Sequence, residues 1–261
     1  MRVRVRFSKF GSSRFIGHLD IMRYFQKAFK RAGLPLAYSE GYHPHPILSF
    51  AQPLSLSFTS DGEYFDMELC KDMESDEIMK ALSEVMCDTI LVNRVTILPD
   101  FQLNEKKTTG MSLITGAYYA ISVRNMSAEL TEAVRNFALL NEYIIEKTTK
   151  KGTKEVNLRA GVHDLLFYHK GCLDEIIRTD DFAYSDNEIR ASLSNAILYD
   201  DKAIIVSLDA GSECNISADL FMNGIGRFAG LNSDEWKRTV HRIDLFGDQN
   251  GRKVPLWNIK S

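Results

Sequence analysis

The hydrophobic period changes repeatedly along the first hundred residues of this 261-residue sequence, and that alternation restricts the possible folds more than any other feature. Residues 2–7 alternate arginines with apolar residues, the period-two pattern of a strand with one solvated side. Residues 18–32 place their apolar side chains on one helical stripe. Gly33 and Pro35 follow, as expected at the end of a helix. The chain is therefore predicted to begin with a strand and a helix.

Two more strands, a helix and a further strand are predicted before residue 100. Apolar alternation over residues 54–58 and 65–69 indicates two strands that face each other across a turn at residues 60–62. The remaining elements are a helix over 75–86, capped by Ser75, and a strand over 90–98. The resulting order, β-α-β-β-α-β, is that of the ferredoxin-like unit. In this unit both helices cover one face of the sheet, so we expect the other face to be free to meet a partner.

The rest of the sequence indicates a second unit. Residues 100–116 lose the apolar period and read as a linker between a first unit, 1–99, and a second, 117–261. In the second unit we predict strands at 118–123, 142–147, 188–199, 203–208 and 243–246, helices at 127–140 and 217–229, and a hairpin turn at Asn250–Gly251. The predicted fold class is α+β, with tandem ferredoxin-like units of which the second is decorated.

Composition excludes several classes of protein. The net charge of −3 gives no overall reason to expect an anionic partner. No stretch approaches the ~18 apolar residues of a membrane span, and the amino terminus lacks a signal-peptide core, so we expect a cytoplasmic protein without membrane contact. The four cysteines form no C-x-x-C pair and are expected to be buried and inert, and we predict neither a metal nor a cofactor.

Charge is nevertheless concentrated locally, because residues 1–60 carry a net charge of +7 and residues 61–100 one of −8. On the first strand, Arg2, Arg4 and Arg6 would stand on the open sheet face and hold a phosphate backbone. Alternatively, Asp66 and Glu68 on a neighbouring strand would neutralise them through cross-strand ion pairs. Accessible and unpaired arginines are the condition for nucleic-acid binding at this face.

Three other segments are candidates for nucleic-acid binding. The first helix carries basic residues off its apolar stripe, and the uncharged loop after it offers planar groups for stacking on bases. A second basic cluster lies at a hairpin-like turn, where lysines suit a polyanion. In each case a solvated surface is the alternative. The candidate residues are Arg23, Lys27, Lys30 and Arg31 on the helix, Tyr38, Tyr42, His43, His45 and Phe50 in the loop, and Lys147, Lys150, Lys151, Lys154 and Arg159 in the cluster.

Support for catalysis is limited to one residue. His18, at the start of the first helix, has a side chain suited to general acid–base chemistry, although pairing with Asp20 or the backbone is an alternative role. The sequence contains no P-loop, dinucleotide-binding fingerprint, G-x-S-x-G or H-E-x-x-H motif. The common nucleotide and hydrolase chemistries therefore lack local support.

Several motifs resemble the bacterial radical SAM-linked protein family, a domain of unknown function. They are FIGHLD at 15–20, RAGLP at 31–35, YSEGYHPHP at 38–46, LSFAQPL at 48–54 and EYFD at 63–66, with weaker matches at 150–159, 215–220, 241–246 and 251–256. Members are similar in being fused to, or encoded beside, a radical SAM enzyme, so the resemblance implies such an enzyme as partner. His43 departs from the family, in which Asn is expected at that position.

These observations lead to three hypotheses. The first is a non-enzymatic accessory module of a bacterial RNA-modification system, which binds RNA and presents it to a radical SAM enzyme. The second is a metal-independent endoribonuclease that uses His18, since tandem ferredoxin-like units with a histidine near the first helix resemble CRISPR repeat-processing endoribonucleases. The third is a protein-binding adaptor that does not contact nucleic acid.

Overall fold

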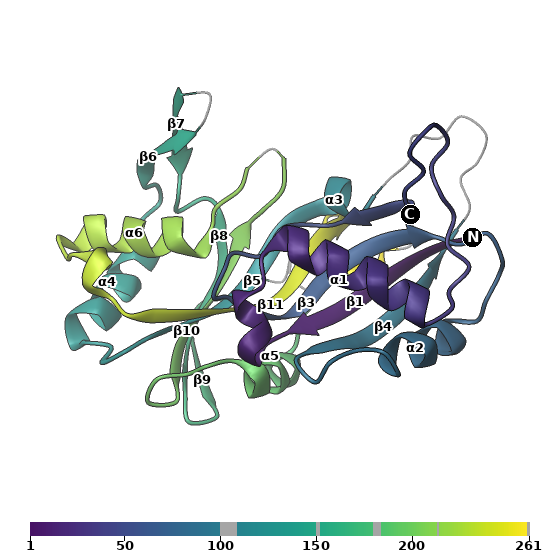
Figure 1. Cartoon of the computed structure of the whole chain (residues 1–261). Coiled ribbons are helices and arrows are strands. Elements are labelled where there is room, and N and C mark those ends of the chain that lie inside the picture. Colours follow the sequence, from purple (N-terminus) through teal and green to yellow (C-terminus); the bar gives the residue numbers. More distant parts are fainter. Residues whose placement is uncertain (100–108, 150–151, 180–183, 213, 260–261) are drawn as a thin grey trace.

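The computed structural model describes residues 1–261 except 100–108, 150–151, 180–183, 213 and 260–261 (Figure 1). Among the described residues, ten strands form one mixed sheet and two form a separate hairpin. The sheet strands are β1 (Arg2–Lys9), β2 (Leu48–Phe50), β3 (Thr59–Glu68), β4 (Ile90–Leu98), β5 (Ile114–Val123), β8 (Val162–His169), β9 (Cys172–Ile177), β10 (Lys202–Asp209), β11 (Arg238–Gln249) and β12 (Arg252–Pro255), and the hairpin strands are β6 (Ile144–Thr149) and β7 (Gly152–Asn157).

Six α-helices and four short 3-10 helices accompany these strands in the described part of the chain. The α-helices are α1 (His18–Arg31), α2 (Ser75–Ser83), α3 (Gly110–Leu113), α4 (Ala128–Ala138), α5 (Asp186–Ser192) and α6 (Ala218–Ala229). The 3-10 helices are η1 (Gly11–Phe15), η2 (Leu193–Asn195), η3 (Ser233–Glu235) and η4 (Leu256–Asn258). The fold is of the α+β class, as predicted, whereas the tandem ferredoxin-like arrangement stays a prediction. No helix in the described part of the chain is long and apolar enough to cross a membrane.

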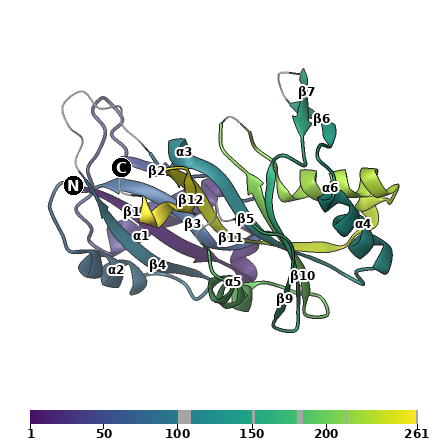
Figure 2. The same ribbon diagram turned by 180° about the vertical axis from the view of Figure 1, so that it is seen from behind.

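One sheet runs through the whole molecule in the order β4-β1-β3-β11-β5-β10-β8-β9. The first hundred residues supply β4, β1 and β3 and the rest of the chain supplies the others, so the two halves meet where β3 lies beside β11. This seam between the halves is a short parallel pairing, in which His241 lies opposite Thr59 and Arg242 opposite Ser60. Figures 1 and 2 show the two halves side by side along this sheet.

The predicted helices of the first half cover one sheet face and enclose an aromatic core. α1 buries the side chains that its apolar stripe predicted, including Phe25 and Phe29. Their rings pack against Phe7 of β1 and Phe65 of β3, with centroids of Phe7 and Phe25 4.7 Å apart. The opposite face was expected to be free, and this prediction is wrong. There the carboxyl-terminal η4 and, further along, α5 lie over the sheet (Figure 2).

The predicted hairpin around residues 60–62 is wrong. Residues 54–58 form no strand, β2 lies earlier, at Leu48–Phe50, and residues 60–62 belong to the interior of β3. Gly62 is required there because the strands are very close. A Cβ on Gly62 would lie 2.4 Å from the Cα of Asp244 in β11. The glycine therefore marks a close approach between two strands and not a turn.

After residue 100 the structure differs from the prediction in three places. Residues 188–199, predicted as a strand, contain most of α5 and all of η2, because Ser185 and Glu188 form a capping box that starts a helix. Strands β8 and β9 were not predicted. The end of the predicted linker is α3 and the beginning of β5, while its residues 100–108 lie outside the described residues. The helices capped by Ser127 and Ser217 and the Asn250–Gly251 turn are confirmed.

The cysteines are less buried than expected. Cys70, Cys87 and Cys172 are exposed and Cys214 is partly buried. Each of the three exposed thiols lies in or beside a turn at the end of a strand or helix, where side chains remain in contact with solvent.

Candidate functional site

Arg4 does not form the accessible cationic surface that was predicted. Its side chain is 1% exposed, and its guanidinium makes a two-pronged ion pair with Asp66, with Nε–Oδ1 2.8 Å and Nη2–Oδ2 3.0 Å. Nη1 donates to the carbonyls of Leu256 and Ile259, at 3.0 and 3.3 Å. The carboxyl-terminal residues thus cover this part of the sheet. The prediction of a reachable Arg4 is wrong, and its alternative, pairing with Asp66, is confirmed.

Arg2 and Arg6 are also engaged within the protein. Arg2 is 8% exposed and lies opposite Glu68 in the β1–β3 register. Arg6 donates to Asp244 at 3.0 Å, and the Tyr64 hydroxyl donates to the other oxygen of that carboxylate at 2.5 Å. Burial raises the pKa of Asp244, and Arg6 partly offsets that rise. All three arginines are thus engaged within the protein, so the condition for nucleic-acid binding at this face, accessible and unpaired arginines, is not met.

A buried polar network around Asp61 lies beside the seam on that face. Ser8 and Asn195 both donate to Asp61 Oδ1 at 2.9 Å, and Ser192 donates to Oδ2 at 3.1 Å. His241 lies 3.7 Å from the carboxylate. Burial would raise the pKa of Asp61, but His241 and the donors Asn195 and Ser8 lower it. The network links β1, β3, α5, η2 and β11, and its hydrogen bonds stabilise the contact between the two halves.

This network is not arranged as a nucleophilic triad. In a serine hydrolase the carboxylate holds the histidine nitrogen that faces away from the serine. Here Thr59 contacts His241 Nδ1 at 2.9 Å, while Ser192 and Asp61 both lie toward Nε2. Ser192 is 6% exposed, and its hydroxyl donates a hydrogen bond to Asp61. A polar pocket of about 350 Å³ adjoins the network, between β1, β4, α5 and η4.

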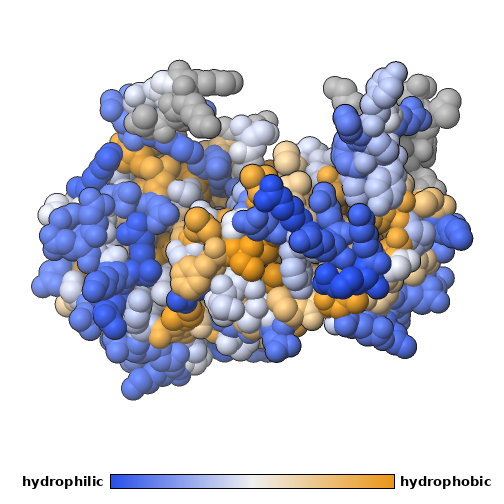
Figure 3. Space-filling view, in the orientation of Figure 1, coloured by the Kyte–Doolittle hydropathy of each residue, from blue (hydrophilic) through white to orange (hydrophobic). Residues whose placement is uncertain are grey.

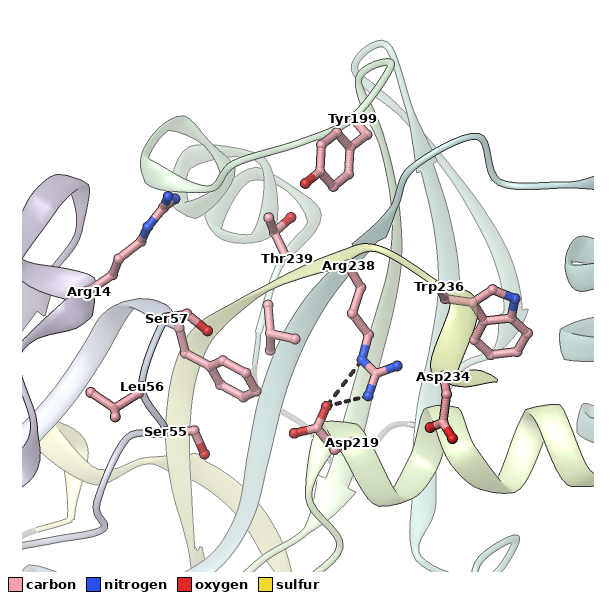
Figure 4. A pocket seen from close by; sticks show the side chains of 12 residues that line it. Arg14, Ser55, Leu56, Ser57, Tyr199, Asp219, Asp234, Trp236, Arg238 and Thr239 are labelled. Carbon is pink, nitrogen blue, oxygen red and sulfur yellow. Dashed lines mark hydrogen bonds and ion pairs between the residues drawn. The ribbon is translucent and has the colours of Figure 1, made fainter. Parts of the chain in front are cut away.

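A larger cleft, of about 530 Å³, opens between the two halves on the other side of the molecule (Figure 4). One wall comes from η1 and the loop at residues 55–58, and the other from β11, η3 and α6. Arg238 of β11 donates to Asp219 of α6 at 2.7 and 3.1 Å, and this ion pair lies in the cleft. Tyr199, Trp236 and Arg14 complete the lining.

Two arginine–aromatic pairs adjoin this cleft, and each contributes one member, Arg14 or Tyr199, to its lining. The Arg14 guanidinium lies 4.6 Å from the ring centre of Phe15, which is 63% exposed. On the other half, Arg124 lies 5.4 Å from the ring centre of Tyr199. The Nε of Arg14 is buried and has no hydrogen-bond partner among the described residues. Sequence reasoning did not identify these residues. The only available signal was that Trp236 is one of two tryptophans in the chain.

The basic side of α1 extends from the same region. The helix begins next to η1, and Arg23, Lys27, Lys30 and Arg31 are all exposed along it. Figure 3 shows a hydrophilic strip over α1 beside an apolar patch at the centre of this face. Arg23 pairs with Asp20 at 3.1 Å at the surface, an interaction that stabilises little.

The predicted loop is exposed and partly ordered by its own contacts. Tyr42 is fully exposed and Tyr38 is 47% exposed, whereas Phe50 is buried in the aromatic core. His45 Nδ1 contacts Ser39 Oγ at 2.9 Å, and its backbone N–H donates to the same oxygen. His43 is exposed. This loop rises from the end of the molecule opposite to the β6–β7 hairpin (Figure 1).

The second basic cluster lies on the β6–β7 hairpin. Lys147 of β6 is partly buried and Lys154 of β7 is exposed, while Lys150 and Lys151 lie outside the described residues. Arg159 donates to the carbonyls of Ala138 and Val162, at 3.3 and 3.2 Å, and burial lowers its pKa. Arg159 is therefore engaged in contacts with the end of α4 and the start of β8.

His18 has little room for a substrate. Its ring meets Phe50 edge-on at 5.5 Å, and burial together with the nearby Lys9 lowers its pKa. The cavity that it lines with Lys9 and Glu63 has about 20 Å³, enough for about one water molecule. Within the described residues, no group of three or more His, Cys, Asp and Glu side chains is placed to hold a metal ion.

Comparison with families of known sequences finds one match. Residues 2–191 match a family described as "Uncharacterized protein conserved in bacteria (DUF2344)". No curated protein matches the chain. The matched part includes η1, α1, the Asp61 side of the seam and the β6–β7 hairpin, whereas Trp236 and Arg238 lie beyond it.

Proposed function

The chain belongs to the family of uncharacterized proteins conserved in bacteria called DUF2344, and we propose that it binds single-stranded RNA in the cleft between its halves and along α1. The observation that carries this proposal is that an exposed row of cations on α1 leads to a cleft adjoined by two arginine–aromatic pairs. The RNA surface proposed is thus the helical face of the first half and not the sheet face.

The cleft has the chemistry of a base-stacking platform. Single-stranded nucleic acids bind through a positive groove for the backbone and aromatic side chains for the bases, with arginine adding cation–π contacts. Tyr199 and Trp236 supply such rings in the cleft, and the exposed ring of Phe15 lies next to Arg14 of its lining. The acidic Asp219 is already paired with Arg238, so it offers little repulsion to an incoming phosphate.

The spacing along α1 suits an extended backbone. Residues 23, 27 and 30 or 31 follow each other at three to four positions, which places their side chains on one side of the helix about 5–6 Å apart along its axis. Lysines bind phosphates as flexible point charges and do not read sequence. We therefore expect binding with weak sequence preference and strong dependence on salt.

Removing two lysines of α1 is expected to make RNA binding less dependent on salt. In Lys27→Gln with Lys30→Gln, the slope of log K against log salt falls by about 1.4, because each lost phosphate contact on a single strand removes about 0.7. The measurement is fluorescence anisotropy of a labelled single-stranded RNA over a salt series.

The matched control makes the same change in charge elsewhere on the surface. Lys71 follows β3 and Lys170 lies in the β8–β9 turn with φ of +48°, and both are exposed. Lys71→Gln with Lys170→Asn is expected to leave the slope of log K against log salt unchanged, because neither lysine belongs to the proposed RNA surface. Asn is chosen at position 170 because it tolerates that backbone conformation. Equal slopes for the two double variants would show that α1 does not contact the RNA.

Trp236 gives a direct optical signal for the cleft. RNA binding is expected to quench tryptophan emission in Trp257→Phe, which keeps Trp236, and not in Trp236→Phe. Trp257 lies under Arg94 at 3.9 Å on the opposite face. Trp236→Ala is expected to weaken binding by about 1–3 kcal/mol, the usual contribution of one stacked base. Quenching that persists in Trp236→Phe would remove the cleft from the proposal.

The role toward a second protein is part of the proposal. The family resemblance implies a radical SAM enzyme as partner, and a module that holds RNA on one face can present it to such an enzyme. Affinity purification of the tagged chain from its native cells, with and without nuclease treatment, tests this role. A partner retained equally in both samples, with no RNA, would favour the protein-binding adaptor instead.

The endoribonuclease hypothesis has less support, because the cavity beside His18 is too small for a nucleotide. Labelled RNA incubated with the protein in EDTA is expected to stay intact. Cleavage that disappears in His18→Ala would favour the enzyme over the binding module.

A further inference from the structure

The geometry points to a second ligand site: we propose that a phosphomonoester binds between the lysine-bearing face of the β6–β7 hairpin and the pocket beside Lys253. This pocket has about 320 Å³ and lies between the start of β5, the end of β10 and β12. The proposal does not depend on RNA binding at α1, since the two sites use different residues.

The register of the hairpin separates its charges by face. Lys147 lies directly opposite Lys154, and the preceding pair, Glu146 opposite Glu155, points to the other side because neighbouring residues of a strand alternate. Like charges directly opposite each other destabilise a strand pair. An anion held between the two lysines would relieve that repulsion.

The lysine-bearing face is directed toward the pocket. Lys147 Nζ donates to the carbonyl of Asn215 at 2.6 Å, in the loop that follows β10. The neighbouring residue Cys214 lines the pocket together with Lys253. Burial and Asp209 raise the pKa of this thiol, and the two hairpin lysines and Lys253 oppose that rise. Lys253 thus lines the pocket, and Lys147 lies against the loop that forms one side of it.

The acidic group of the pocket is already neutralised. Asp209 Oδ1 accepts a hydrogen bond from Lys253 Nζ at 3.0 Å and lies 2.7 Å from His163 Nε2, and both contacts lower the pKa of Asp209. Lys147 and Lys154 therefore leave the site with excess positive charge. Thr115 Oγ1 is buried without a hydrogen-bond partner among the described residues, and Ser112 and Ser212 add hydroxyls to the lining.

These groups favour a compact dianion. A phosphomonoester carries a charge near −2 and three terminal oxygens, which can accept from lysines and hydroxyls together. An internal phosphodiester carries a single charge and is less suited to two converging lysines. The terminal phosphate of an RNA and a small phosphorylated metabolite share this group, so the experiment must distinguish them.

The test titrates the full chain with inorganic phosphate by isothermal calorimetry in a phosphate-free buffer at pH 8. In Lys147→Gln with Lys154→Gln, affinity is expected to fall by about tenfold or more per lysine, the effect of losing a charge-assisted hydrogen bond. Glu146→Gln with Glu155→Gln alters the opposite face of the same hairpin and is expected to keep or increase affinity. Lys27→Gln with Lys30→Gln is expected to bind phosphate normally.

A second arm identifies the source of the phosphate. A single-stranded RNA with a 5′-phosphate and the same RNA with a 5′-hydroxyl are compared as competitors of inorganic phosphate. Stronger competition by the phosphorylated RNA assigns the site to an RNA end. Phosphate binding with no competition by either RNA assigns it to a small phosphorylated molecule, and equal competition by both RNAs would show that internal phosphodiesters bind and would overturn the preference for a phosphomonoester. Absence of phosphate binding, or equal affinity in the lysine and glutamate variants, would overturn the proposal, and circular dichroism of each variant excludes misfolding as the cause.

Discussion

Replacing Asp66 by alanine is expected to lower the free energy of unfolding by about 3–5 kcal/mol, because it leaves the buried guanidinium of Arg4 without its counter-ion. Arg4 is 1% exposed, so water cannot solvate the charge in place of the carboxylate. Asp66 Oδ2 also accepts from the backbone N–H of Gly110 at 2.7 Å, and this bond is lost as well. Urea unfolding followed by circular dichroism measures the change.

An exposed ion pair provides the comparison. Asp20→Ala removes the partner of Arg23 at the surface and is expected to change stability by less than about 1 kcal/mol. Replacing both buried partners, as in Arg4→Met with Asp66→Leu, is expected to recover much of the loss, because no uncompensated charge remains. If Asp66→Ala lowered the free energy of unfolding no more than Asp20→Ala does, Arg4 would have to be accessible to solvent. An anion could then bind at the sheet face.

Gly62→Ala is expected to destabilise the protein by more than about 4 kcal/mol, or to prevent folding, because overpacking at a backbone contact is among the most damaging substitutions. The new Cβ would meet the Cα of Asp244 at 2.4 Å and the carbonyl oxygen of Ile243 at 2.7 Å. Backbone atoms cannot move aside as a side chain can. The yield of soluble protein and its urea midpoint are the measurements.

Gly33→Ala is the control for this substitution. Gly33 has φ of +66° with open space around it, so alanine there incurs only the conformational penalty of about 1–2 kcal/mol. If Gly62→Ala unfolded at the same urea concentration as Gly33→Ala, β3 and β11 would not be in contact at this point. The pairing of the two halves through β3 and β11 would then be wrong.

The seam matters for function because it sets the shape of the cleft. The loop at residues 55–58 comes from the first half and Trp236 and Arg238 from the second, and all of them line the same space. The Asp61 network and the β3–β11 pairing join the two halves that supply these walls. We therefore expect substitutions at the seam to weaken RNA binding in proportion to the loss of structure.

Local sequence patterns predicted some residues of the candidate site correctly and misplaced others. The basic side of α1 was predicted from helical spacing and is exposed as expected. The positions of the apolar residues within a surface helix are enough to predict which side faces water. Arg4 was misplaced because strand alternation defines two faces but not which of them the rest of the chain will cover. The carbonyls that cover it, those of Leu256 and Ile259, lie some 250 positions away.

The sequence by itself determined the first strand, α1, the helices capped by Ser127 and Ser217, and the Asn250–Gly251 turn, because each depends on interactions within a few residues. Tertiary structure alone decided that Gly62 lies within a strand, that Asp244 pairs with Arg6, and that Arg14 and Trp236 face one cleft. These outcomes depend on which strands become neighbours in the sheet. That choice is made by packing between distant segments, and no local pattern of residues encodes it.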